Sequence, residues 1–134
     1  TDKVMSKVKK ENSTMVTNWT TALKEAGADS DGALRRLSGN ISLYQKILRM
    51  FPQDETYKQI EPALQANDWA ALLAAAHTLK GVAGNLGLIP LSNICSDTVA
   101  LLRAEQYMEA VASCAKIRDA DTGFIEIIRL LEEA

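Results

Sequence analysis

Apolar residues recur every three or four positions along most of this chain, and that spacing predicts α-helices rather than strands. In the N-terminal part they predict a helix ending near Gly27, and the set comprises Val8, Met15, Val16, Trp19, Leu23 and Ala26. Asp31 is expected to cap a short helix through Leu37, which Gly39-Asn40 would end. A longer helix is then predicted to begin near Ile41.

Two prolines interrupt the next stretch of helical spacing. Pro52 lacks a backbone N–H and clashes with the preceding turn, so it must kink or restart the helix that begins near Ile41. The apolar residues of the continuation are Tyr57, Ile60, Ala63 and Leu64. Pro62 lies inside this continuation and is expected to cost it one hydrogen bond.

Three further helices are predicted in the C-terminal half, over residues 69–87, from Pro90 to about Ala104, and from about Tyr107 to Leu131. Asn67 or Asp68 is expected to cap the first of them. Pro90 suits the first turn of the second, where its missing N–H has no helical acceptor to lose. The small and polar residues 119–123 are expected to loosen the middle of the third.

These elements predict an all-α fold. Short loops between long helices favour antiparallel neighbours, so we expect an antiparallel up-down four-helix bundle with an additional N-terminal helix. One hydrophobic core suffices for 134 residues, and the chain is expected to form a single domain. Residues 1–38 would be its N-terminal helical segment and residues 39–134 the bundle.

Composition and charge disfavour several classes of function. The chain has 15 Lys and Arg against 17 Asp and Glu, a formal charge of -2, and gives no reason to expect nucleic-acid binding. No stretch reaches the roughly 20 apolar residues that cross a bilayer, and the N-terminus lacks a signal-peptide core. We therefore expect a cytoplasmic chain that does not insert into a membrane. Cys95 and Cys114 are expected to be buried, and no metal site is predicted.

The only histidine, His77, is the best candidate for chemistry. At about 100° per residue, the side of its helix opposite the imidazole carries the expected core residues Leu72, Ala75, Leu79, Val82 and Leu86. The imidazole shares its own side with Ala70, Leu73, Lys80, Gly81, Gly84 and Leu88, and is expected to point outward. Lys80, one turn on, places a cation beside it.

Two glycines accompany His77 on its side of the helix. Each glycine inside a helix costs roughly 1 kcal/mol relative to alanine, so something should offset that cost. Gly81 and Gly84 either permit close packing by another helix or leave room for a partner's active site to close over His77. Their position on the histidine side favours the second interpretation. A neutral imidazole beside an ammonium group suits phosphoryl transfer, which needs a nucleophile and dispersed positive charge.

The run Ala76-His77-Thr78-Leu79-Lys80-Gly81 closely resembles the signature of histidine-containing phosphotransfer domains. In that signature a histidine, any residue, then Leu, Lys and Gly mark the site that accepts a phosphoryl group. Residues 31–51 resemble the segment before the histidine helix in domains attached to bacterial hybrid sensor kinases, through Leu34-Arg35-Arg36-Leu37, Gly39-Asn40, Leu43-Tyr44 and Phe51. The start at Thr1 and the stop at Ala134 favour a domain from the end of such a kinase over a free-standing carrier.

The resemblance implies a phosphoryl carrier of two-component signal transduction rather than a self-sufficient enzyme. His77 would take the phosphoryl group from an aspartyl phosphate on a receiver domain and pass it to the aspartate of another, with Lys80 beside the phosphoryl oxygens. Mg²⁺ would belong to the receiver, and the chain itself would need no cofactor. Receiver docking is expected around His77, on Leu73, Ala74, Gly81, Gly84 and Leu88.

One departure from the family pattern and three alternatives remain. Many relatives have Leu-Glu where this chain has Thr98-Val99, so any helper role of that glutamate is missing. The first alternative is a helical interaction domain on the same scaffold without phosphotransfer. The second, a phosphohistidine phosphatase or kinase fragment, is disfavoured because no nucleotide-binding lobe is present. The third, dimerisation through the N-terminal helix or the Trp19 region, is compatible with transfer.

Overall fold

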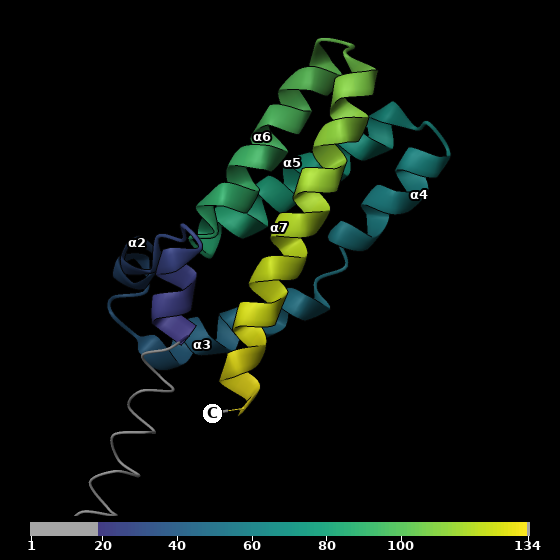
Figure 1. The fold of residues 1–134 in the computed structure, drawn as a ribbon. Coiled ribbons are helices and arrows are strands. Elements are labelled where there is room, and N and C mark those ends of the chain that lie inside the picture. The colour runs from purple at the N-terminus through teal and green to yellow at the C-terminus, as the bar shows by residue number, and fades with distance from the viewer. Residues whose placement is uncertain (1–18, 134) are drawn as a thin grey trace, which may run out of the picture.

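A computed structural model describes residues 19–133 of the chain, and this part is helical without any strand (Figure 1). A helical segment over residues 19–25 comes first. It is followed by α2 (Ser30–Arg36), α3 (Ile41–Met50), the 3-10 turns η1 (Phe51–Gln53) and η2 (Tyr57–Gln59), α4 (Ile60–Gln65), α5 (Trp69–Asn85), α6 (Ile89–Arg103) and α7 (Tyr107–Glu133). The predicted all-α class is confirmed.

The three longest helices, α5, α6 and α7, lie side by side, and α4 packs against α5 (Figure 1). Short loops join α5 to α6 and α6 to α7, so these neighbours run antiparallel. At the other end of the molecule α3 crosses α7, and α2 lies against α3. The helical bundle expected from the sequence is therefore confirmed, and α5 forms one of its outer faces. None of the helices within residues 19–133 is long and apolar enough to span a membrane.

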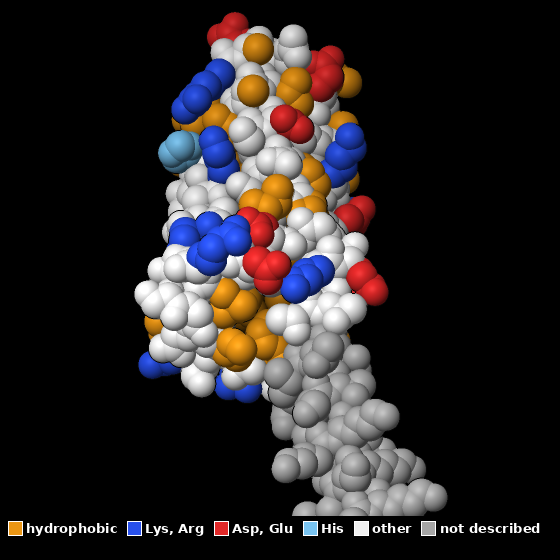
Figure 2. Space-filling view, turned by 90° about the vertical axis from the view of Figure 1, so that its left-hand side faces the viewer, with side chains coloured by type: hydrophobic (Ala, Val, Ile, Leu, Met, Phe, Trp, Pro, Cys, Tyr) orange, Lys and Arg blue, Asp and Glu red, His pale blue; other side chains and the backbone are white. Residues whose placement is uncertain are grey.

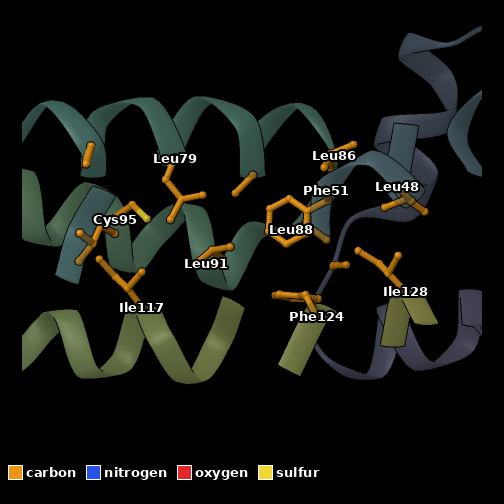
Figure 3. Close-up of a cluster of buried hydrophobic side chains, with 14 of the residues drawn as sticks. Leu48, Phe51, Leu79, Leu86, Leu88, Leu91, Cys95, Ile117, Phe124 and Ile128 are labelled. Carbon is orange, nitrogen blue, oxygen red and sulfur yellow. The ribbon is translucent and has the colours of Figure 1, made fainter. Parts of the chain in front are cut away.

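One cluster of buried side chains fills the bundle from end to end (Figure 3). The members labelled in the close-up are Leu48, Phe51, Leu79, Leu86, Leu88, Leu91, Cys95, Ile117, Phe124 and Ile128. Each such side chain contributes about 1.5–3 kcal/mol through its removal from water. Of the predicted core side of α5, Leu72, Ala75, Leu79 and Leu86 are buried and Val82 is half-buried.

Side-chain caps explain where several helices begin. Asp68 caps α5, since its Oδ1 accepts a hydrogen bond from the backbone N–H of Ala71 at 3.1 Å. Asp29, not Asp31, caps α2, because the Oδ1 of Asp29 accepts from the N–H of Gly32 at 2.9 Å. The predicted cap at Asp31 is wrong: this residue lies inside the first turn and pairs with Lys24 at 3.3 Å on the surface.

The predictions made for the two prolines and for the middle of α7 have different outcomes. Pro52 lies in η1 and ends α3 at Met50, as predicted. Pro62 lies in the first turn of α4, where backbone N–H groups lack helical acceptors, so the expected loss of a hydrogen bond does not arise. The expected loosening of α7 is wrong, because the helix continues unbroken through Gly123. The buried Ile117, Phe124 and Ile128 keep helical spacing across this region and outweigh the low helix propensity of one glycine.

The N-terminal helix ends as predicted near Gly27. Gly27 has a φ of +92°, and the N–H of Ala28 donates to the carbonyl of Leu23 at 2.8 Å, which closes the helix end. Trp19 is buried against Tyr44, with ring centroids 6.1 Å apart. The Trp19 side chain is therefore part of the chain's own core, and dimerisation through the N-terminal helix or the Trp19 region stays a prediction. The predicted apolar positions Val8, Met15 and Val16 lie outside the described residues.

Candidate functional site

His77 lies in the middle of α5 with its side chain exposed, and Lys80 is exposed one turn further on. Figure 2 shows the histidine in pale blue at the edge of the drawn face, with Lys and Arg side chains beside and below it. Within residues 19–133 neither side chain makes a hydrogen bond or an ion pair with the protein. The imidazole is therefore accessible to a reacting group, as predicted, and the ammonium group is free to contact one.

The two glycines of the histidine side have different surroundings. A Cβ placed on Gly81 would meet no atom within 4 Å, so internal packing does not require a glycine there. A Cβ on Gly84 would lie 3.5 Å from Oγ of Ser92, an ordinary contact with α6. The Ser92 hydroxyl itself donates to the carbonyl of Lys80 at 3.1 Å, which ties α6 to this stretch of α5. Open space for a partner is thus found at Gly81, while Gly84 is half-buried beside α6.

The C-terminal end of α5 is held by residues from the N-terminal part of the chain. Nη2 of Arg36 donates to the carbonyls of Gly84 and Asn85, at 3.1 and 3.0 Å. The Tyr44 hydroxyl donates to the carbonyl of Leu86 at 2.8 Å. These bonds satisfy carbonyls that a helix end leaves without intrahelical partners, and the guanidinium also suits the negative end of the helix dipole. The sequence contains no local signal for these contacts between distant residues.

Gly87 forms the turn that follows α5. Its φ is +78°, and a Cβ at this position would lie 2.5 Å from the carbonyl oxygen of Asp29. The N–H of Asp29 donates to the carbonyl of Gly87 at 2.7 Å, so the two backbones are in direct contact. Only glycine combines this φ with such a close approach. The turn thereby fixes the start of α2 against the end of the histidine helix.

The five predicted docking residues do not all reach the surface. Ala74 and Gly81 are exposed, and Leu73 and Gly84 are half-buried. Leu88 has an exposed fraction of 0% and lies within the core cluster, so its predicted docking role is wrong (Figure 3). The helical spacing of α5 ends at Asn85, because the turn at Gly87 redirects the chain. Leu88 is the N-cap residue of the next helix, α6.

Thr98 and Val99, where the sequence departs from the pattern it resembles, are both buried. Thr98 has an exposed fraction of 0%, and its hydroxyl donates to the carbonyl of Ile94 at 2.8 Å. The hydroxyl of Ser113 on α7 then serves as donor to Thr98. Val99 is 4% exposed. Neither side chain is available at the surface for a reaction at His77.

The cysteines are buried and free, as predicted. Burial raises the pKa of Cys95 to about 12 and that of Cys114 to about 11, so both remain thiols at neutral pH. In the described part of the chain no group of three or more His, Cys, Asp and Glu side chains is placed to hold a metal ion. The chemistry that the described surface offers therefore centres on His77 and Lys80.

Residues 48–133 match the Hpt domain family. The matched residues make up more than half of the chain. The matched region contains α5 with His77, Lys80 and Gly81, and it extends through α6 and α7. Helix α2 and most of α3 lie before it. No curated protein and no solved structure matches the chain.

Proposed function

Because the chain belongs to the Hpt domain family, whose members are phosphocarriers in phosphorelay signalling rather than enzymes, we propose that His77 is its phosphoacceptor. It takes the phosphoryl group from an aspartyl phosphate on one receiver domain and passes it to the aspartate of another. The observation that carries this proposal is the exposed imidazole of His77, which has no partner within residues 19–133, beside Lys80 and the open surface at Gly81.

The transfer step balances without any further reactant. The lone pair of the unprotonated ring nitrogen attacks phosphorus, an N–P bond forms, and the P–O bond to the receiver aspartate breaks. The aspartate leaves as a carboxylate with that electron pair, while the proton on the other ring nitrogen stays in place. Passage to the second receiver reverses these events, with its carboxylate as nucleophile and the imidazole as leaving group.

Lys80 and the receiver supply the positive charge in this proposal. The transition state spreads negative charge over the equatorial oxygens, and in our proposal the Lys80 ammonium, one turn from His77, contacts them. Mg²⁺ belongs to the receiver in our proposal, and this chain contributes the nucleophile and one cation. We also propose a cytoplasmic location and an origin in a hybrid sensor kinase, which the resemblance of residues 31–51 supports.

Transfer of radiolabelled phosphate from a panel of phosphorylated receivers tests the proposal. We expect the wild-type chain to gain label that is stable to alkali and lost in acid, as a phosphoramidate is, and His77→Gln to gain none. Circular dichroism of the variant controls for folding. Absence of label in the folded wild-type chain across a broad panel would instead favour a helical interaction domain without phosphotransfer.

A further inference from the structure

A hollow of about 180 Å³ lies on the side of α5 that faces away from His77. It forms where the segment that joins α3 to α4 passes beside α7 (Figure 1), with η1 packed against α7 and η2 against α5. Its apolar walls include Phe51, Leu79 and Ile125, and Asp121 belongs to its polar lining. This volume is far larger than the roughly 10–15 Å³ that one water molecule needs in a cavity. The hollow therefore has room for a small molecule.

Asp121 is a buried carboxyl that lines this hollow without a protein partner. It is 3% exposed, and it makes no hydrogen bond or ion pair with any of residues 19–133. Removing a carboxylate from water without such partners is costly, so buried charges in proteins are normally paired. The hollow is the space beside Asp121 in which a compensating group fits.

Two further polar side chains of the lining have oxygen atoms without partners. Oδ1 of Asp54 accepts a hydrogen bond from the backbone N–H of Thr56 at 2.8 Å, which fixes this carboxylate, and its Oδ2 accepts none in the described part of the chain. The hydroxyl of Tyr57 has no hydrogen-bond partner there either. Burial and the nearby charges of Glu61 and Asp121 raise the pKa of Tyr57, so its hydroxyl keeps its proton. The three side chains together offer acceptors to a ligand with several N–H donors.

The charge around the hollow is negative. The basic residue of its lining, Lys58, pairs with Glu55 at 3.2 Å. Arg118 of α7, whose charge acts on the neighbouring phenol, pairs with Asp119 at 3.8 Å. The acidic side chains near the hollow that have no basic partner within residues 19–133 are Asp54, Glu61 and Asp121. This surplus of negative charge favours a cationic occupant over an anionic one.

The make-up of the hollow favours an organic cation over a metal ion. Ca²⁺ and Mg²⁺ take about six or more oxygen ligands. Among the described residues no group of three or more His, Cys, Asp and Glu side chains is placed to hold such an ion. The walls formed by Phe51, Leu79 and Ile125 supply no ligand atoms. An organic ammonium ion carries N–H donors at one end and hydrocarbon at the other, which matches carboxylates beside an apolar wall.

We propose that the hollow binds a small organic ammonium ion, with its charged end at Asp121 and Asp54. Its hydrocarbon end lies against the apolar walls, and its N–H groups donate to the two carboxylates and the phenol hydroxyl. Such a ligand contacts the segment between α3 and α4 together with α5 and α7, so it stabilises the folded chain by mass action. The site is independent of phosphotransfer, because it involves neither the histidine nor a receiver.

Benzylamine, an ammonium ion with an aromatic ring, tests the site, and benzyl alcohol is the neutral molecule of similar shape. Thermal unfolding at about pH 7.5, where the amine and the carboxylates are ionised, measures how the melting temperature rises with the concentration of each probe. Amide chemical shifts in NMR spectra locate the bound probe. Asp121→Asn removes the buried charge, and Asp119→Asn on the exposed side of α7 is the matched control. Mg²⁺ added at constant ionic strength tests the metal alternative.

We expect saturable binding of benzylamine to the wild-type chain, with the largest shifts at the amides of Asp54, Tyr57 and Asp121. Benzyl alcohol should bind about tenfold or more weakly, because it lacks the charge that strengthens hydrogen bonds to carboxylates. Asp121→Asn should weaken benzylamine binding by about tenfold or more, and Asp119→Asn should leave it unchanged. Circular dichroism controls for folding of both variants.

Several results would overturn the proposal. One is the absence of a saturable shift with benzylamine at millimolar concentration. Another is equal affinity for the amine and the alcohol, a comparison that needs only the wild-type chain. Equal affinity of the wild type and folded Asp121→Asn would place the bound amine elsewhere. Displacement of benzylamine by Mg²⁺ would make the occupant a metal ion. None of these measurements uses a receiver or phosphate, so failure of this site leaves the carrier function of His77 to its own test.

Discussion

The hydroxyl of Tyr44 on α3 donates a hydrogen bond to the carbonyl oxygen of Leu86, the residue that ends the histidine helix, at a distance of 2.8 Å. Both side chains are buried, with exposed fractions of 0% and 4%. Burial raises the pKa of Tyr44 above its usual value, so its hydroxyl remains a donor throughout the neutral range. This bond connects the N-terminal helices to the element that carries His77.

Tyr44→Phe should therefore destabilise the protein without changing its surface. The substitution leaves a buried carbonyl without a partner, and we expect the free energy of unfolding to fall by about 1–3 kcal/mol. Urea denaturation would measure the change. Tyr57→Phe is the control, because the Tyr57 hydroxyl makes no hydrogen bond within the described residues and the side chain is only half-buried. A Tyr44→Phe protein as stable as the wild type would contradict this account of the helix end.

Gly81→Ala should separate stability from transfer. A Cβ at Gly81 meets no atom of the chain, so alanine should stabilise α5 by up to about 1 kcal/mol. The same methyl group would stand in the space over which a receiver closes, and we expect transfer to slow by about tenfold or more. Gly123→Ala on α7, which also has open space, is the matched control for stability and should leave transfer unchanged. Unimpaired transfer in Gly81→Ala would show that this space is not used.

Asp121 should make the stability of the protein depend on pH. Its side chain is 3% exposed; burial, with a smaller contribution from the nearby Asp54 carboxylate, raises its pKa from 3.8 to about 6. A carboxyl whose pKa is raised by folding favours the neutral form in the folded state. The free energy of unfolding should therefore fall as pH rises from about 4 through about 6, by roughly 3 kcal/mol in all from this group.

Asp121→Asn should remove that dependence. We expect the variant to be more stable than the wild type at about pH 7.5 and close to it at about pH 4, because asparagine never ionises. Urea denaturation at several pH values would measure both proteins. Asp119→Asn, two residues earlier on the exposed side of α7, is the control. A variant less stable than the wild type at about pH 7.5 would show that the ionised Asp121 carboxylate is stabilising instead.

Leu88→Ala should behave as a core substitution and not as the loss of a docking contact. Removing most of a side chain with an exposed fraction of 0% should lower the free energy of unfolding by about 2–5 kcal/mol. Receiver affinity of the fraction that remains folded should match that of the wild type. Thermal unfolding together with calorimetric binding would test both expectations. Reduced affinity with unchanged stability would restore Leu88 to the docking surface.

Features that depend on local sequence were predicted well. The bounds of α5, its cap at one of Asn67 and Asp68, and the outward direction of His77 follow from apolar spacing and cap chemistry within a few residues. The prediction that Leu88 lies on the docking surface failed. Helical spacing applies only within a helix, and the turn at Gly87 follows the end of α5. The predicted cap of α2 was Asp31 and not Asp29, because both aspartates precede the same run of helical spacing.

Contacts between distant parts of the chain were not predictable in this way. Arg36 reaches the carbonyl of Gly84 across 48 residues of sequence, and that contact exists only once α2 has packed against the end of α5. A surface hollow between Ile47 of α3 and Asn85 of α5 likewise arises from the relative placement of these two helices. Helical spacing indicates which residues share a face of one helix, but the pairing of faces is decided by the packing of the whole core.

A pulse-chase experiment would show whether His77 carries a phosphoryl group between two receivers. The chain is labelled by a phosphorylated first receiver, purified, and mixed with an unphosphorylated second receiver and Mg²⁺. We predict that label leaves the chain and appears on the aspartate of the second receiver, and that His77→Gln never acquires it. Label acquired by His77→Gln, or label on the wild-type chain that a bound second receiver does not remove, would contradict phosphoryl transfer through His77.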